Sequence, residues 1–128
     1  MSLCIAAAGK TVAIAATTFT LSWTHSIEKV EWRESYAVTE HGLVPSEAAV
    51  KGSGAGMEPG AGAVLRDGWW VWNPPAKPLP RLVLAASGAT GAGWRLCHSG
   101  GCVELGATSG DETVVRRCAE DGPADPVR

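Results

Sequence analysis

The sequence predicts an all-β fold, a small antiparallel sandwich or open barrel of about eight or nine short strands. Apolar and polar residues alternate with a period of two in several short segments, as in strands that bury one face. The 128-residue chain holds 16 glycines and 8 prolines, which interrupt it every few residues. No segment keeps the 3.6-residue period of an amphipathic helix, so we expect strands joined by tight turns.

The first two strands are expected at residues 2–8 and 11–16, with a turn at Gly9-Lys10 between them. The clearest strand follows at residues 18–27, where apolar side chains alternate with hydroxyl side chains. A second strongly alternating segment covers residues 30–38, so the two segments predict a β-hairpin.

This hairpin places both apolar sets on one face if its loop is the residue pair 28–29, and a common buried face is what fixes register. Glu-Lys is not a favoured turn pair, so a wider loop of the same parity would serve equally well. With the short loop, the cross-strand pairs would be Ile27–Val30, His25–Trp32, Trp23–Glu34, Leu21–Tyr36 and Phe19–Val38.

The second half of the chain is expected to add shorter strands. A weaker strand at residues 43–51, broken at Pro45, precedes the glycine-rich loop 52–62. The Asp-Gly turn signal at 67–68 predicts a hairpin of residues 63–65 and 69–72. After an extended, polyproline-like linker, the remaining strands are predicted at residues 82–86, 94–97 and 102–105.

We therefore predict a single β-rich domain at residues 1–106. Residues 107–128 are polar and rich in glycine and aspartate, which predicts a frayed tail. One helical turn is expected near Thr113 to Cys118.

Charge and hydropathy exclude several kinds of partner. The 11 basic and 13 acidic residues give a net charge of −2, which offers no attraction for nucleic acid or an anionic membrane. The longest apolar stretch, Leu3 to Ala16, is interrupted at Gly9-Lys10 and is shorter than the roughly 20 residues of a membrane span. No basic segment precedes it, so the sequence predicts no signal peptide and a cytoplasmic protein.

Cys97 and Cys102 flank the last predicted turn and would face each other in a regular hairpin, about 4.5–5.5 Å apart at Cα. A disulfide there would indicate an oxidising compartment. The alternatives are two reduced thiols packed as small hydrophobes, or a zinc site with His98, although the spacing matches no common zinc pattern.

His25 and Glu34 are the most notable polar pair, because both lie on the apolar face of the predicted hairpin. As diagonal neighbours they would be roughly 7–8 Å apart at the backbone, and a buried carboxylate needs a donor. Trp23, Trp32 and Tyr36 would frame them. The pair is either a ligand or proton-transfer site, or a satisfied polar contact inside an aromatic core.

The glycine-rich loop is a second candidate site. Its successive amides can form an anion-binding nest, lined by Ser53, Met57 and Glu58; the alternative is an adaptable surface loop. It lacks the Lys-Ser/Thr pair of a phosphate-binding loop and the Gly-x-Ser-x-Gly spacing of a nucleophile elbow. His25 and Ser26 point to opposite faces of a strand, which excludes a hydrolase pair.

Three ordered blocks, His-Ser-x-Glu-Lys (25–29), Gly-x-Gly-Met (54–57) and Asp-Gly-Trp (67–69), resemble the bacterial domain of unknown function 1850 family (DUF1850). The resemblance covers about residues 2–106. That family has no established activity, and its genes commonly lie beside those of TRAP-type transporters, especially the TAXI subfamily. These transporters take up organic acids with a periplasmic binding protein and a sodium gradient.

The resemblance implies a periplasmic or membrane-associated location, because many relatives carry an N-terminal export or anchoring segment. It also marks positions that fit the family pattern but have no known role: His25, Ser26, Glu28, Glu34, Gly54 and Gly56.

Three functions follow as hypotheses: a non-enzymatic accessory or binding protein linked to a TRAP/TAXI transporter, an independent domain that binds a small organic anion, and an enzyme of unassigned reaction. No catalytic residue, metal or cofactor is assigned. The candidate ligand-binding residues are His25, Ser26, Glu28, Trp32, Glu34, Ser53, Gly54, Gly56, Met57 and Glu58.

Overall fold

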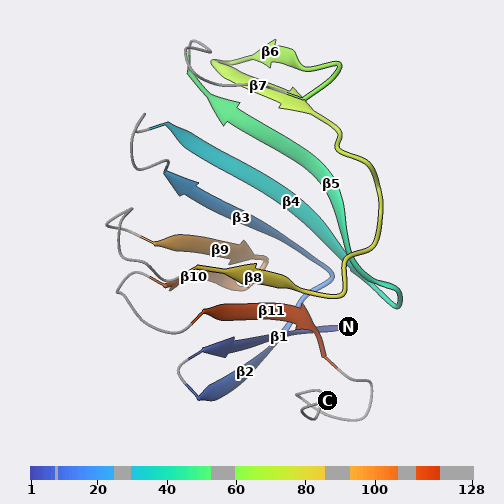
Figure 1. Ribbon diagram of the computed structural model, residues 1–128, viewed down its shortest axis with the longest axis vertical. Coiled ribbons are helices and arrows are strands. Elements are labelled where there is room, and N and C mark those ends of the chain that lie inside the picture. Colours follow the sequence, from blue (N-terminus) through green and yellow to red (C-terminus); the bar gives the residue numbers. More distant parts are fainter. Residues whose placement is uncertain (8, 25–29, 53–59, 86–92, 107–111, 119–128) are drawn as a thin grey trace.

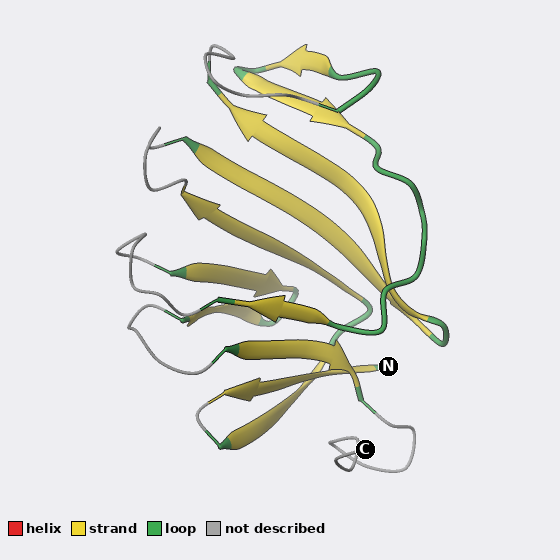
Figure 2. Cartoon of the chain, viewed as in Figure 1, coloured by secondary structure: helices red, strands yellow, loops and turns green. Residues whose placement is uncertain are grey.

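The computed structural model describes residues 1–7, 9–24, 30–52, 60–85, 93–106 and 112–118. All eleven regular elements within these ranges are β-strands, and they form two antiparallel sheets (Figures 1 and 2). The sheets do not close into a barrel. The predicted all-β, sandwich-like fold is confirmed, with more strands than expected.

The smaller sheet has the strand order β2-β1-β11-β8 and brings segments from the two ends of the chain together. Gly9 turns the chain between the first two strands with a φ of 79°, which costs a residue without a Cβ little. The strands of this small sheet are β1 (Ser2–Ala7), β2 (Lys10–Ala15), β8 (Leu82–Leu84) and β11 (Thr113–Arg117).

The larger sheet has the order β10-β9-β3-β4-β5-β7-β6. Figure 1 shows β6 and β7 at the edge of this large sheet that lies farther from the small sheet. Its strands are β3 (Thr18–Thr24), β4 (Glu31–Thr39), β5 (Gly42–Lys51), β6 (Val64–Arg66), β7 (Trp69–Trp72), β9 (Trp94–His98) and β10 (Gly101–Leu105).

The hydrophobic core lies where the two sheets face each other. Strands β1, β3, β4, β5, β8, β9, β10 and β11 supply it, and the two residues that β1, β3 and β4 each contribute alternate, as the period of two predicts. Its buried members are Leu3, Ile5, Phe19, Leu21, Tyr36, Val38, Leu43, Leu84, Leu96, Leu105 and Val115.

The predicted hairpin of β3 and β4 forms, but its register is shifted by two residues from the short-loop pairing. Trp23 lies opposite Trp32, and Leu21 lies opposite Glu34. The short-loop pairs were therefore wrong for Trp23–Glu34, Leu21–Tyr36, Phe19–Val38 and His25–Trp32. A shift of two preserves parity, so both apolar sets still lie on the inner face of the sheet.

Pro45 does not break β5, contrary to the sequence analysis. The N–H of Leu43 points away from β4 and donates to the carbonyl of Leu79 at 2.8 Å. The backbone nitrogen of Pro45, two residues further on, also points away from β4. The N–H that proline lacks would therefore not have bonded to β4. The register then shifts at a bulge opposite Ser35 and Tyr36, a common accommodation beside proline.

Residues 113–117 form β11, so the helical turn predicted there was wrong. Thr113 and Val115 are 2% and 0% exposed and alternate toward the interior. The β-branched Thr-Val-Val run suits a pleated, half-buried position. β11 lies between β1 and β8, and this long-range pairing is not apparent in a polar local sequence.

Two disulfides link the described strands. Cys97 lies directly opposite Cys102 with Cα atoms 4.0 Å apart, so the predicted pairing is confirmed. The second bond joins Cys4 to Cys118 across 114 residues of sequence, with Cα atoms 5.0 Å apart. This bond was not predicted from the sequence, because the pair depends on β1 lying beside β11.

Candidate functional site

Four tryptophans from four strands form a row across the inner face of the large sheet. The ring centroids lie 4.8 Å apart for Trp94 and Trp23, and 6.2 Å apart for Trp23 and Trp32. Trp72 meets Trp32 edge-on at 6.4 Å and an interplanar angle of 88°. All four side chains of this tryptophan row are half-buried, so indole surface remains available to a ligand.

Strand register explains why these indoles meet. Trp23 and Trp32 are direct cross-strand partners. Val50 lies opposite Trp32 on β5, and Ala48 lies opposite Trp72. Because β5 presents short side chains at these positions, the indole of Trp72 can reach over β5 toward Trp32.

Contacts from outside the strands hold both ends of the row. The indole N–H of Trp94 donates to the carbonyl of Ala85 at 3.0 Å, and Trp94 packs against the core. At the other end, Gly60 lies so close to the Trp72 indole that a Cβ would overlap the ring. These contacts limit rotation of the two end indoles.

Glu34 lies beside the row and is tied to the core by Tyr36. The Tyr36 hydroxyl donates to Glu34 Oε1 at 2.6 Å. Burial raises the pKa of the Tyr36 hydroxyl well above its usual range, and the hydrogen bond and charge of Glu34 raise it further. The phenol therefore stays protonated at neutral pH and acts as the hydrogen-bond donor to Glu34.

The predicted site is only partly within the described residues. Trp32 and Glu34 lie on the same face of β4, as the alternation predicted. The contact of His25 with Glu34 and the glycine-loop nest remain predictions, but the observed register, with Leu21 opposite Glu34, is not the register from which that contact was predicted. The other candidates lie outside the described residues: His25, Ser26, Glu28, Ser53, Gly54, Gly56, Met57 and Glu58.

The strands that lead to these undescribed residues, β3 and β5, lie on either side of β4 and end at the same end of the large sheet. Thr24 pairs with Glu31, and Trp32 pairs with Val50. Lys51 is therefore adjacent to Glu31 at the same end of the large sheet. The two segments singled out from sequence, 25–29 and 53–59, thus continue from neighbouring strand ends.

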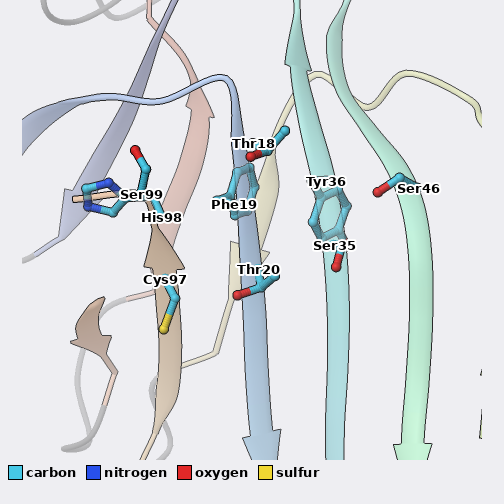
Figure 3. A pocket seen from close by; sticks show the side chains of 9 residues that line it. All are labelled: Thr18, Phe19, Thr20, Ser35, Tyr36, Ser46, Cys97, His98 and Ser99. Carbon is cyan, nitrogen blue, oxygen red and sulfur yellow. The ribbon is translucent and has the colours of Figure 1, made fainter. Parts of the chain in front are cut away.

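The opposite face of the large sheet carries a shallow groove of about 500 Å³. Figure 3 shows that its lining side chains come from β9, β3, β4 and β5 or the turn after β9. Most of the lining residues carry a hydroxyl group. The lining residues are Thr18, Phe19, Thr20, Ser35, Tyr36, Ser46, Cys97, His98 and Ser99.

A cationic contact also lies on this outer face. The Arg33 guanidinium carbon is 4.3 Å from the centre of the Trp69 ring, and Lys51 Nζ is 5.7 Å from it. Arg33 and Lys51 alternate outward on β4 and β5, opposite in direction to Trp32 and Val50. Two cations thus contact one indole, with the Glu31 carboxyl on the same face of the sheet beside Lys51.

Sequence reasoning did not place Trp72 and Trp94 in one row with Trp23 and Trp32. For Trp72 a signal was present, because alternation within residues 69–72 puts the second and fourth residues of β7 on one face. That signal does not say which strand lies beside β7.

For Trp94 no local signal exists. β3 ends at Thr24 and β9 begins at Trp94, so the two strands are far apart in sequence. They nevertheless pair, with Leu21 opposite Leu96. Only the folded sheet therefore brings Trp23 and Trp94 together.

Two further observations limit the chemistry of the described residues. They contain no group of three or more His, Cys, Asp or Glu side chains placed to hold a metal ion. The part of the chain that the structure describes also has no helix able to cross a bilayer.

Comparison with known proteins gives one match. A family model described as a domain of unknown function (DUF1850) matches residues 19–105. The match includes the whole tryptophan row and excludes β1, β2 and β11. No curated protein and no solved structure matches the chain.

Proposed function

The chain belongs to the DUF1850 family, and from this premise we propose that it is a non-enzymatic binding domain that assists a TRAP/TAXI-type transporter. Its role is to hold a small organic solute on the tryptophan row. The observation that carries the proposal is this row of four half-buried indoles beside the carboxylate of Glu34.

The row favours a ligand with an apolar or planar body. Indole faces supply a large contact area that loses little entropy on binding, because a tryptophan side chain has few rotatable bonds. The end contacts from Ala85 and Gly60 support this role, since a preorganised site spends less binding free energy on ordering.

Glu34 determines the polarity of the ligand near it. A hydrogen-bond donor or a cation on the ligand is favoured beside this carboxylate, and an anionic group is repelled. An organic acid, the solute class that the family resemblance implies, would therefore place its carboxylate away from Glu34 and its apolar body on the indoles.

The disulfides support a location outside the reducing cytoplasm. All four cysteines of the chain are paired, and such bonds persist in oxidising compartments. This agrees with the periplasmic location implied by the family resemblance, rather than the cytoplasmic one expected from the N-terminal sequence.

Tryptophan fluorescence and thermal unfolding with benzoate, phenylacetate and glutarate test the binding role. Trp32→Ala should weaken binding at least about tenfold, because an aromatic pair contributes about 0.5–1.5 kcal/mol beyond its buried area. Trp69→Ala is the matched control, since Trp69 lies on the outer face. Equal loss in both variants would contradict a site on the row.

Co-purification with the transporter tests the second half of the proposal. The full chain should be retained by the membrane subunits or the solute-binding subunit of a TRAP/TAXI transporter, and retention should depend on the solute. Solute binding without retention would leave an independent binding domain and contradict the accessory role.

The second candidate function is an independent domain that binds an organic anion on the outer face. Arg33 and Lys51 beside Trp69 favour it, because they offer positive charge next to an aromatic surface. In that case Trp69→Ala and Arg33→Gln should abolish the thermal shift with glutarate, while Trp32→Ala should leave it unchanged.

A further inference from the structure

We propose that the Cys97–Cys102 disulfide is a thiol–disulfide exchange site whose partner is a protein dithiol. The two cysteines are directly opposed on β9 and β10. The Cys102 side chain is exposed and that of Cys97 is half-buried. β10 is the edge strand of the large sheet, so a thiolate can reach Cys102 without any opening of the fold.

The other disulfide of the chain has the opposite environment. Cys4 and Cys118 are 1% and 3% exposed, and their bond joins the central part of the small sheet to the end of β11. Since exchange requires contact between sulfur atoms, this bond should react only when the fold opens. The buried Cys4–Cys118 disulfide therefore serves as an internal control for the reactivity of the exposed Cys97–Cys102 disulfide.

The neighbours of the exposed pair favour Cys97 as the leaving thiolate. Thr20 lies directly opposite Cys97 on β3, and both line the groove in Figure 3. A hydroxyl there can donate a hydrogen bond to sulfur as negative charge develops. Arg95 and Glu104, the next residues on the same face, lie directly opposite each other, so their charges offset and the hydroxyl of Thr20 is the feature that favours Cys97.

The reaction balances with a dithiol as the reductant. One partner thiolate attacks Cys102 Sγ, the S–S bond breaks, and its electron pair remains on Cys97 Sγ. The partner's second thiolate then attacks the partner sulfur of the mixed disulfide and releases Cys102. The partner loses two electrons and two protons and becomes a disulfide, while Cys97 and Cys102 each gain a proton.

The fold can survive this exchange. β9 remains paired with both β10 and β3, and the buried disulfide still joins β1 to the residue after β11. The reduced protein should therefore keep its secondary structure, which is the condition for a reversible site.

Alkylation mapping of the full oxidised chain tests the proposal. The native protein is treated with dithiothreitol, quenched with iodoacetamide and mapped by peptide mass spectrometry. Cys97 and Cys102 should be labelled at least about tenfold faster than Cys4 and Cys118, because thiol access controls the rate. Equal rates, or reduction only in denaturant, would overturn it.

Glutathione and a threonine variant test the direction of attack. After brief exposure to reduced glutathione and an acid quench, the mixed disulfide should be found on Cys102. Thr20→Val should slow reduction, and Thr18→Val, a change on the same face opposite Ala37, should not. Glutathione mainly on Cys97, or equal effects of the two variants, would overturn the assigned direction.

Discussion

The Tyr36 hydroxyl donates a 2.6 Å hydrogen bond to Glu34, two residues earlier on the same face of β4. The Tyr36 ring also stacks on Phe19 in the core, with centroids 5.1 Å apart. One side chain thus joins the packed core to the polar group beside the tryptophan row. Changes at this boundary should therefore alter both the stability of the fold and the geometry of the row.

Tyr36→Phe should lower the free energy of unfolding by about 1.5 kcal/mol, because it removes a hydrogen bond to a charged, half-buried acceptor. Urea unfolding followed by circular dichroism measures the change. In a Glu34→Gln background the same substitution should cost less. An equal cost in both backgrounds would show that the hydrogen bond to Glu34 does not cause the loss of stability.

Stability should also fall at alkaline pH through Tyr36. Folding raises the pKa of this phenol above its value in the unfolded chain, which is near 10. The contribution is present below about pH 10 and is lost as the pH rises further, because the unfolded chain releases the proton first. Tyr36 is the chain's single tyrosine, so ultraviolet titration reports it alone.

The two disulfides should contribute very different stabilities. Replacing Cys4 and Cys118 by alanine should cost about 4–5 kcal/mol, since this bond closes a loop of more than a hundred residues. The same change at Cys97 and Cys102 should cost about 2 kcal/mol, because that loop is short. Equal losses in thermal unfolding would contradict the loop-entropy explanation.

Gly42→Ala should destabilise the protein by about 2–3 kcal/mol. Gly42 has a φ of 125°, and a Cβ there would meet the backbone of Leu79. That contact holds the linker to β5 through the paired Leu43 and Leu79 hydrogen bonds. Gly9→Ala is the control, because φ is positive but no atom lies near; it should cost only about 1 kcal/mol.

Gly60→Ala should change the tryptophan fluorescence and weaken binding on the row, with little effect on unfolding. The added methyl group would overlap the Trp72 indole and force it to move. In a Trp72→Ala background the substitution should have no further effect on fluorescence. If Gly60→Ala still changed the fluorescence in the Trp72→Ala background, the change would not arise from Trp72.

Local patterns were enough for the hairpins of the fold. The alternation around Phe19 and Tyr36 predicted which face of β3 and β4 is buried, and the spacing of Cys97 and Cys102 predicted their pairing. The exact register failed by two residues, since parity fixes the buried face but leaves the loop length open.

By itself, the sequence determined the all-β class, the inward faces of the strands and the family, because these depend on residue alternation and short ordered motifs. Only the tertiary structure decided that β9 joins β3, that β11 completes the small sheet, and that four tryptophans meet in one row. The physical reason is that strand hydrogen bonds are made by the backbone, so residue identity specifies the buried face of a strand but not which distant strand becomes its neighbour.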